Sequence, residues 1–268
     1  MSDNLGDRMK SYEMEVAGRK LLPLIPAMAR IDGRCFSSFT RDMERPYDKR
    51  FSDLMVETTM YLVQETNACM GYTQSDEITL TWLSTSPQSE IFFNGRIQKM
   101  ESVLAGMTTA FFLVTLPDHL DRDYADRMPH FDARVWNVPN KEEGSNVFLW
   151  REYDATKNSI SMAAQAHFSH KELMHKHGGD MQEMLFQKGI NWNDYPTFFK
   201  RGSYVRRCNT LRKFTTVEMA KLPPLHEARR NPELVVERTD YQLIEMPTFS
   251  KVTNRSEVVY GGAMPCVS

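Results

Sequence analysis

Asp32-Gly33-Arg34-Cys35-Phe36-Ser37-Ser38-Phe39 directly follows an apolar segment, residues 24–31, and Gln74-Ser75-Asp76-Glu77 directly precedes an alternating run, residues 78–83. Both neighbouring segments predict strands, so each stretch places a carboxylate at a strand end. If the two strands pair, Asp32 and Asp76 converge at one edge of the sheet. Two converging carboxylates can hold divalent metal against nucleotide phosphates. For either stretch alone, the alternative is an ordinary turn with a capping aspartate.

The surrounding segments predict a domain that mixes a sheet with helices. Strands are expected at residues 21–31, 68–72, 77–83 and 131–138, and residues 48–65 and 96–113 show helical spacing of apolar side chains. Asp48 is expected to cap the first of these helices. The order β-α-β-β-α-β is the split βαβ, ferredoxin-like arrangement. The expected fold class is therefore α+β with an antiparallel, palm-like sheet, as in polymerase palms and nucleotidyl cyclases.

The chain of 268 residues, with 41% hydrophobic residues, is long enough for one large domain with or without an appendage. We expect a palm catalytic core at residues 1–140 and a helical and basic region completing the catalytic domain at residues 141–222. Helical patterns at residues 146–168, 171–175 and 181–188 support this division. Pro, Gly and charged residues increase after Pro223, which predicts a small, partly irregular C-terminal appendage at residues 223–268.

Charge and cysteine usage bound the partners and the compartment. The formal net charge of −2 means that any RNA site must be a local patch. The four cysteines form no Cys-x-x-Cys pair, which predicts reduced thiols in a cytoplasmic protein. The polar start, from Ser2 to Arg8, lacks the apolar core of a signal peptide. No stretch approaches the ~20 apolar residues of a membrane span, so no membrane contact is expected.

The two strand-end carboxylates suit magnesium chemistry. Magnesium takes oxygen ligands, often one or two carboxylates with substrate phosphates, and two ions ~3.5–4 Å apart can stabilise both oxygens of a phosphoryl displacement. Glu77 is adjacent to Asp76, but neighbours on a strand face opposite ways, so we expect only Asp76 of these two to hold metal. Gly33 permits close backbone approach, and the turn at residues 33–38 can aim successive N–H groups at a triphosphate.

Four motifs in one order make the chain similar to a known family. They are Asp32-Gly-Arg-x-Phe-x-x-Phe39, Gln74-Ser-Asp-Glu77, Phe131-Asp-Ala-Arg-Val135 and Trp150-Arg151. With them the chain resembles the tRNA-His guanylyltransferase family, which includes guanylyltransferase-like RNA repair enzymes, from about Arg19 to Arg206. The resemblance implies an enzyme that adds nucleotides to the 5′ end of RNA in the 3′–5′ direction. A nucleoside triphosphate first activates a 5′-monophosphate end, and the 3′-hydroxyl of the incoming nucleotide then attacks it.

The resemblance also implies roles for single residues, with GTP and ATP as substrates. Two magnesium ions would be held by Asp32, the Gly33 carbonyl and Asp76. The backbone of Gly33, Arg34, Cys35, Phe36 and Ser37 would hold the incoming triphosphate. Further family positions near the phosphates or the activating nucleotide are Arg30, Arg45, Asp48, Ser75, Arg96, Lys99 and Asn158. Arg45 stands where many relatives carry Lys. The positive charge is kept, but the compact ammonium group of Lys is replaced by the planar guanidinium of Arg, which can donate two parallel hydrogen bonds.

Arg96 and Lys99 also suit an anion without the family. They lie three residues apart at the start of an expected helix and therefore share a face. A helix N-terminus with two cations attracts phosphate. A solvated basic face is the alternative.

One departure from the family pattern bears on the substrate. The eukaryotic enzymes carry a His-x-x-Asn-type motif where this chain has residues 154–160, which retain Asn158 but lack the histidine. This segment resembles the repair-type branch and favours template-dependent 5′-end repair of truncated tRNA. Untemplated guanosine addition to tRNA-His is the narrower alternative. The family is tetrameric, so the resemblance also implies a homo-oligomer.

Two further clusters lie in the second half of the chain. Residues 200–213 are the densest basic stretch and hold no acidic residue. Phosphate contacts dominate nucleic-acid affinity, so we expect tRNA contacts there, with a solvated or subunit-interface stretch as the alternative. The expected contacts are Lys200, Arg201, Arg206 and Arg207. A histidine cluster without zinc spacing is expected to be a polar helix surface; it comprises His167, His170, His175 and His177.

Two other classes of function stay open. A nucleotidyl cyclase or a small-molecule nucleotidyltransferase would use the same palm, although the hairpin at residues 72–77 lacks the Gly-Gly-Asp/Glu-Glu-Phe pattern of cyclases. A non-catalytic RNA-binding relative is the other class. Loss of metal ligands is the usual mark of a dead palm, whereas this chain has both Asp32 and Asp76.

Overall fold

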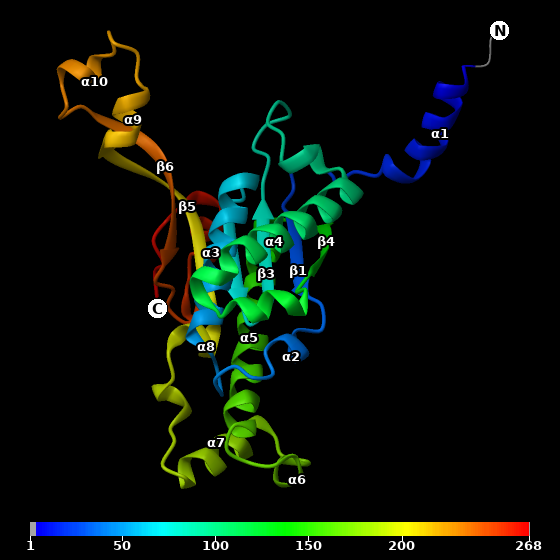
Figure 1. Ribbon diagram of the computed structural model, residues 1–268, viewed down its shortest axis with the longest axis vertical. Coiled ribbons are helices and arrows are strands. Elements are labelled where there is room, and N and C mark those ends of the chain that lie inside the picture. Colours follow the sequence, from blue (N-terminus) through cyan, green and yellow to red (C-terminus); the bar gives the residue numbers. More distant parts are fainter. Residues whose placement is uncertain (1–3, 268) are drawn as a thin grey trace.

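The computed structural model describes residues 4–267, so Ser2 and Asp3 of the polar start lie outside the described residues. One antiparallel sheet of six strands, in the order β4-β1-β3-β2-β5-β6, forms the centre (Figure 1). The strands are β1 (Ala27–Gly33), β2 (Met70–Gln74), β3 (Glu77–Trp82), β4 (Phe131–Asn137), β5 (Ser203–Lys213) and β6 (Val235–Ile244). The first four strands and the helices between them have the predicted β-α-β-β-α-β order, which confirms the α+β, palm-like fold.

The helices follow the predicted patterns with shifted ends. The longer ones are α1 (Leu5–Ala17), α3 (Lys49–Thr66), α4 (Ile97–His119), α5 (Lys141–Gln165), α7 (Gly178–Gln187) and α11 (Arg255–Gly261). The shorter ones are α2 (Phe36–Phe39), α6 (His170–Leu173), α8 (Thr197–Arg201), α9 (Thr216–Lys221) and α10 (Glu227–Arg230), and 3-10 turns are η1 (Phe92–Gly95), η2 (Arg122–Arg127), η3 (Trp192–Asp194) and η4 (Phe249–Lys251). Asp48 caps α3 as predicted, because its carboxylate accepts the Arg50 N–H at 3.0 Å.

β1 begins at Ala27, later than predicted. Pro23 and Pro26 have no N–H group and therefore cannot donate to a sheet ladder. Leu21 instead donates its N–H to the Gly95 carbonyl at 2.8 Å, so the segment before β1 lies against the start of α4.

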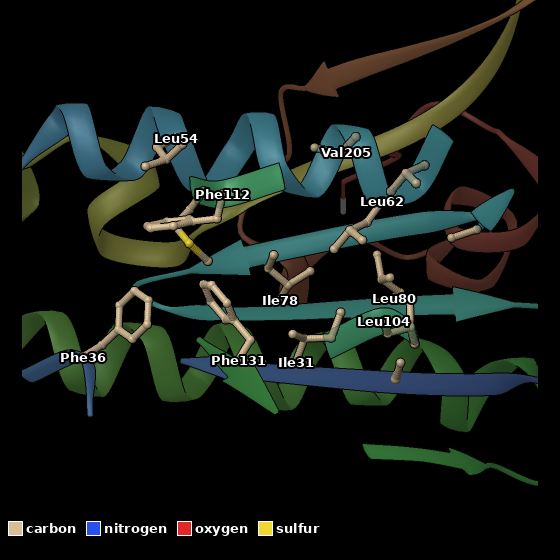
Figure 2. Packing of buried hydrophobic residues seen from close by; sticks show 14 of the residues in the cluster. Ile31, Phe36, Leu54, Leu62, Ile78, Leu80, Leu104, Phe112, Phe131 and Val205 are labelled. Atoms are coloured by element: carbon tan, nitrogen blue, oxygen red, sulfur yellow. The ribbon is translucent and has the colours of Figure 1, made fainter. Parts of the chain in front are cut away.

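Helices cover both faces of the sheet. Strand alternation sends Ile31 and Ile78 to one face, where they pack with Leu54 of α3 and Leu104 of α4 (Figure 2). The opposite face is covered by α5 and α11 and is centred on Met28, Tyr72, Phe148 and Val258. Arg30 and Asp32 alternate with Ile31, so they lie on the face of the sheet that α5 covers.

Residues 223–268 do not form the predicted appendage. β6 pairs with β5 from Tyr204↔Ile244 to Lys213↔Val235 and so extends the central sheet. α11 returns to α5, where Gly144 leaves room for Tyr260: an added Cβ would lie 1.9 Å from the tyrosine Oη. Phe249 is fully buried in the same core. Of this segment, α10 projects from the body together with α9 at the tip of the β5–β6 hairpin (Figure 1).

One helix bears on the expected absence of a membrane segment. Within residues 4–267, α4 is long and apolar enough to cross a membrane by length and composition alone, so the expectation that no stretch approaches this is wrong. In the structure α4 packs along the sheet, with Met100, Leu104 and Phe112 fully buried. Its outer side is not covered, and Val114 is 79% exposed.

Candidate active site

The two acidic stretches meet at one end of the sheet. Asp32 is in register with Glu77, the first residue of β3, and Gly33 donates its N–H to the Asp76 carbonyl at 3.1 Å. Asp76 sits in the two-residue turn between β2 and β3, and Ser75 forms the other half of that turn at φ 49°. The structure therefore brings Asp32, Gly33 and Asp76 together, as the sequence predicted.

The electrostatics of this turn favour a bound cation. Burial raises the pKa of Asp76, and the neighbouring Asp32 charge raises it further, although a hydrogen bond from Ser75 Oγ at 3.0 Å acts in the opposite direction. Among the described residues near this turn, Arg30 and Arg151 pair with Glu77 and Arg134 pairs with Asp132. Arg34 contacts the His130 ring at 3.2 Å, so none of these four arginines forms an ion pair with Asp32 or Asp76. Two close carboxylates and the Gly33 carbonyl form an oxygen donor set that fits magnesium.

Glu77 is held on the α5 side by arginines. Arg151 Nη2 donates to Glu77 Oε2, Gln74 Nε2 donates to the same oxygen at 3.0 Å, and Arg30 Nε lies 3.6 Å from Oε1. Arg30, which the resemblance placed near phosphates, therefore contacts this carboxylate. Arg151 received no role from the sequence, although the Trp150-Arg151 pair was one of the motifs; a lone arginine on a helix gives no hint of a partner on a distant strand.

The turn after β1 has a fixed shape. Cys35 adopts left-handed backbone angles at φ 59°, and the Phe36 ring packs over Gly33, where an added Cβ would lie 2.4 Å from the ring. The Gly33 N–H is used by Asp76, and the Arg34 N–H donates to the His130 carbonyl at 2.9 Å. Of the predicted backbone cradle, Cys35, Phe36 and Ser37 at the start of α2 are thus left to face a triphosphate.

A pocket adjoins this turn, between the start of α3, α5 and α8. Three predicted nucleotide-binding residues line it, namely Arg45, Asp48 and Ser75. Aromatic and polar lining residues that sequence reasoning missed are Tyr47, Phe51, Ser159, Phe198 and Phe199. They come from α3, α5, α8 and the loop before α3, so no local pattern could have grouped them.

Two of the predicted pocket residues differ from expectation in detail. Burial acts to raise the pKa of Asp48, but hydrogen bonds from Arg50 and from the backbone outweigh it and hold the pKa below its ordinary value. Asp48 is thus committed to capping α3 and to the Arg50 ion pair at 2.8 Å. Asn158 is exposed and does not line the pocket; its neighbour Ser159 does.

Arg96 and Lys99 lie at the opposite end of the sheet. Arg96 precedes α4 and forms an isolated backbone β-bridge with Lys20, in the segment that leads into β1. Asp32 lies near the other end of β1. Lys99 stands 4.7 Å from the centre of the Phe93 ring. Within a single chain, these two cations therefore do not reach the carboxylate pair.

The predicted tRNA contacts on the basic stretch need correction. Lys200 is 8% exposed and donates to the Asn193 carbonyl, and burial lowers its pKa. Arg206 is 6% exposed and donates to the Ala263 carbonyl at 2.5 Å, because strand alternation turns it toward the C-terminal segment. Arg201 is half-buried, and only Arg207 of the four is exposed.

The histidine cluster lies on an exposed surface. His167, His170, His175 and His177 are all exposed, and no group of three or more potential metal-ligating side chains of His, Cys, Asp or Glu occurs within residues 4–267. The oxygen donors at the β2–β3 turn are two carboxylates and a backbone carbonyl, so they do not make up such a group of three side chains.

A palm-like antiparallel sheet with paired carboxylates at a hairpin turn, beside a pocket, is the arrangement of nucleotidyltransferases. The profile of a family described as tRNAHis guanylyltransferase matches residues 6–139. The tRNA(His) guanylyltransferase of Neurospora crassa is 30% identical over 223 residues, which cover 77% of this chain and 74% of that protein.

Two solved structures extend the match to nearly the whole chain. A bacterial tRNA(His) guanylyltransferase-like protein in complex with ATP aligns with a TM-score of 0.77 and 34% identity, covering 96% of this chain and 99% of its own. One in complex with GTP aligns with a TM-score of 0.70 and 32% identity, covering 93% and 95%. The chain belongs to the tRNA(His) guanylyltransferase family.

Proposed function

We propose that this protein is a magnesium-dependent nucleotidyltransferase that adds nucleotides to the 5′ end of tRNA in the 3′–5′ direction. The observation that carries the proposal is the convergence of Asp32 and Asp76 beside a pocket, in a chain of this family. The ATP and GTP complexes of bacterial relatives support nucleoside triphosphates as substrates. The relative named for tRNA(His) supports tRNA as the acceptor.

Residues at different positions in the site have different proposed roles. Asp32, the Gly33 carbonyl and Asp76 hold magnesium, which supplies charge stabilisation for in-line phosphoryl displacement when bound. The N–H groups of residues 35–37 orient the incoming triphosphate. Arg45 is exposed at the pocket rim and is held in place by the Thr40 carbonyl at 2.9 Å, so its charge is available to the activating nucleotide.

An extension assay tests this function. The full chain is incubated with 5′-labelled tRNA lacking its first nucleotide, together with ATP, GTP and magnesium. Wild type extends the tRNA, and Asp32→Asn loses on the order of 10³-fold in rate, because several kcal/mol of metal-borne stabilisation disappear. No extension by wild type contradicts the proposal. A cyclic nucleotide formed without RNA would instead support the cyclase alternative.

Templated repair is the finer proposal about substrate. The segment at residues 154–160 and the near-complete alignment with bacterial guanylyltransferase-like proteins support it. The test uses several truncated tRNAs that differ in the nucleotide opposite the gap. Addition of the complementary nucleotide to each supports repair, whereas guanosine addition confined to tRNA-His supports the narrower alternative.

A homo-oligomer is the second finer proposal, and the outer side of α4 supports it. Gly106 lies in the middle of this helix, is exposed, and an added Cβ there would meet no atom within 4 Å. Glycine in a helix interior costs about 0.8–1.0 kcal/mol relative to alanine. Close approach of a second copy accounts for that cost, and Ala110 and Val114 continue the same exposed apolar side.

An antiparallel α4 pair would also complete the site. Because α4 runs from Ile97 near one end of the sheet to His119 near the other, reversal of a second α4 would bring Arg96 and Lys99 of the second copy toward the carboxylate end. Val114→Glu is expected to lower the mass measured by light scattering, while Val217→Glu in α9, which is also an exposed valine, leaves it unchanged. Mixing inactive Asp76→Asn with inactive Lys99→Glu should restore activity if the site is shared, and no recovery contradicts sharing.

A further inference from the structure

Glu77 sits at the centre of a small ionic network behind the metal-facing carboxylates. It is opposite Asp32 in the β1–β3 register and adjacent to Asp76 in the chain. Its carboxylate receives Arg151 from α5, Gln74 from β2, and the charge of Arg30 from β1. The β2–β3 turn is therefore fastened to a helix and to a neighbouring strand through one side chain.

Burial of the Arg151 guanidinium costs desolvation free energy, and a contribution to stability alone does not explain why the chain keeps it there. Its side chain is 4% exposed, and within the described residues its Nε is buried without a hydrogen-bond partner. Replacing buried ion pairs by apolar residues is often neutral or stabilising, so stability is a weak reason for such a pair. The guanidinium is nevertheless fixed on three sides: by Glu77, by Asp154 at 3.1 Å, and by the Trp150 ring at 4.7 Å from Cζ.

We propose that Arg151 is a positioning residue that fastens the β2–β3 turn through Glu77, so that Asp76 faces Asp32 in the geometry that binds metal. Glu77 lies on the same face of the sheet as Asp32, but Arg151 and Gln74 occupy its carboxylate, so it does not compete as a ligand. Asp154, on the next turn of α5, keeps the guanidinium pointed at Glu77. Partners behind metal ligands typically change metal affinity by about 10–100-fold when they are lost. This inference rests on the proposed function.

The test measures metal binding without turnover. Free Mn²⁺ is followed by electron paramagnetic resonance during titration of the full chain, and urea unfolding is measured in parallel. Arg151→Met is expected to weaken Mn²⁺ binding by about 10–100-fold. The matched control is Arg212→Met, which removes an arginine from an ion pair with Glu218 at 2.7 Å, far from the turn. It should leave Mn²⁺ binding unchanged.

A double variant separates positioning from mere stability. Arg151→Met leaves Glu77 with only the more distant Arg30, at 3.6 Å, as a cationic partner. Glu77→Gln removes this poorly compensated charge, so the double variant should regain part of the lost resistance to urea. In the double variant the β2–β3 turn still lacks its ion pair to α5, so Mn²⁺ binding should remain weak. Unchanged Mn²⁺ affinity in Arg151→Met would overturn the inference.

A second comparison distinguishes the inference from its foundation. If Glu77→Gln alone abolishes binding as Asp76→Asn does, while Arg151→Met binds normally, then Glu77 is a ligand and the positioning role is wrong. If wild type fails to bind Mn²⁺ at all, the proposed function itself fails. If wild type binds Mn²⁺, Asp76→Asn does not, and Arg151→Met binds it normally, then the positioning role of Arg151 is wrong while the proposed function stands.

Discussion

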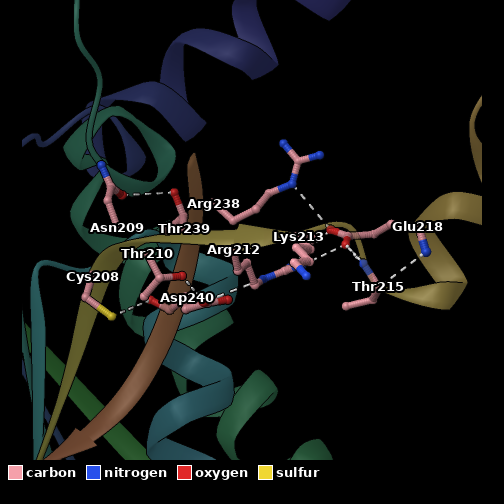
Figure 3. A network of polar contacts seen from close by, with 10 residues as sticks. All are labelled: Cys208, Asn209, Thr210, Arg212, Lys213, Thr215, Glu218, Arg238, Thr239 and Asp240. Carbon is pink, nitrogen blue, oxygen red and sulfur yellow. Dashed lines mark hydrogen bonds and ion pairs between the residues drawn. The ribbon is translucent and has the colours of Figure 1, made fainter. Parts of the chain in front are cut away.

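The β2–β3 turn and the β5–β6 arm, residues 207–241, are both rich in charge, yet they are built in opposite ways. At the turn, Asp32 and Asp76 lie close together, and no ion pair with either of them occurs within residues 4–267, while burial and their mutual repulsion raise the pKa of Asp76. On the arm, opposite charges pair: Arg212 donates to Glu218 at 2.7 Å, and Arg238 donates to the same carboxylate at 3.3 Å (Figure 3).

The two regions differ in whether opposite charges are paired, and this difference distinguishes a candidate binding site from other charged clusters. The arm is basic along one strand, but its hairpin partner and α9 bring acids to it, and Lys213 likewise pairs with Glu233. The charges of Arg212, Lys213 and Arg238 are thus used within the chain. The turn gathers two negative charges that no ion pair within the described part of the chain compensates, and a bound divalent cation would supply the missing positive charge.

The largest expected effect comes from removing the uncompensated charge. Asp76→Asn should lower the rate of nucleotide addition on the order of 10³-fold. Without divalent metal it should also raise the free energy of unfolding at neutral pH. A carboxyl with a raised folded-state pKa binds its proton more tightly when folded, so its stabilising contribution exists at low pH and is lost as pH rises through that pKa.

Urea unfolding across pH checks the second half of this prediction. The stability advantage of Asp76→Asn over wild type should grow as pH rises above the ordinary aspartate value of 3.8. An advantage that is absent at every pH, or one that shrinks with rising pH, would show that the turn stores no such repulsion.

The next effect tests the shape of the turn after β1. Gly33→Ala should destabilise the fold by about 1–3 kcal/mol, because the new Cβ would lie 2.4 Å from the Phe36 ring, which is itself packed in the core. Catalysis should fall with it. Gly179→Ala in α7 is the control, since nothing lies within 4 Å of its added Cβ, and it should be neutral or slightly stabilising. Equal behaviour of the two variants in urea unfolding would contradict this account.

The sequence predicted the convergence of the two carboxylates but not the arginine that holds Glu77. The strand order followed from alternation and spacing, and it brought Asp32 to Asp76. Strand alternation also separates Glu77 from Asp76, and the structure indeed holds Glu77 by Arg151. The chain position of Arg151, however, gives no sign of that pair, because it depends on how α5 crosses the sheet.

The errors have one physical cause. A run such as residues 200–213 was interpreted as one basic surface, but a strand distributes its side chains to two faces. Arg206 faces the C-terminal segment and Arg207 faces outward. The tail after Pro223 was likewise interpreted from composition, and the β5–β6 pairing that integrates it joins residues about thirty positions apart. Such pairing leaves no local pattern.

The neighbours Arg206 and Arg207 offer a sharper form of the comparison. Arg207→Met should weaken tRNA binding and reduce the slope of log affinity against log salt by about 1, as loss of one phosphate contact does. Arg206→Met should leave that slope unchanged and lower stability by about 1 kcal/mol, because the Ala263 carbonyl loses its donor. Filter binding at several salt concentrations measures the slope. A reduced slope in Arg206→Met would mean that the buried arginine becomes accessible to RNA.

The smallest effect is expected on the arm itself. The hydrogen bond from Arg212 holds the pKa of Glu218 well below its ordinary value of 4.5, so the stabilising contribution of this carboxylate is present above that value and is lost as pH falls through the folded-state pKa. Glu218→Gln should lower the unfolding midpoint slightly at pH 7 in low salt and not at all in 1 M salt, where charges are screened within about 3 Å. Glu237→Gln is the control, since its partner is the neutral Asn209 amide at 3.1 Å and its effect should not depend on salt. Neither variant should change nucleotide addition, because Glu218 and Glu237 are both bonded to partners within the arm and lie away from Arg207. A large loss of activity in Glu218→Gln would place the arm, and not only the turn, in contact with substrate.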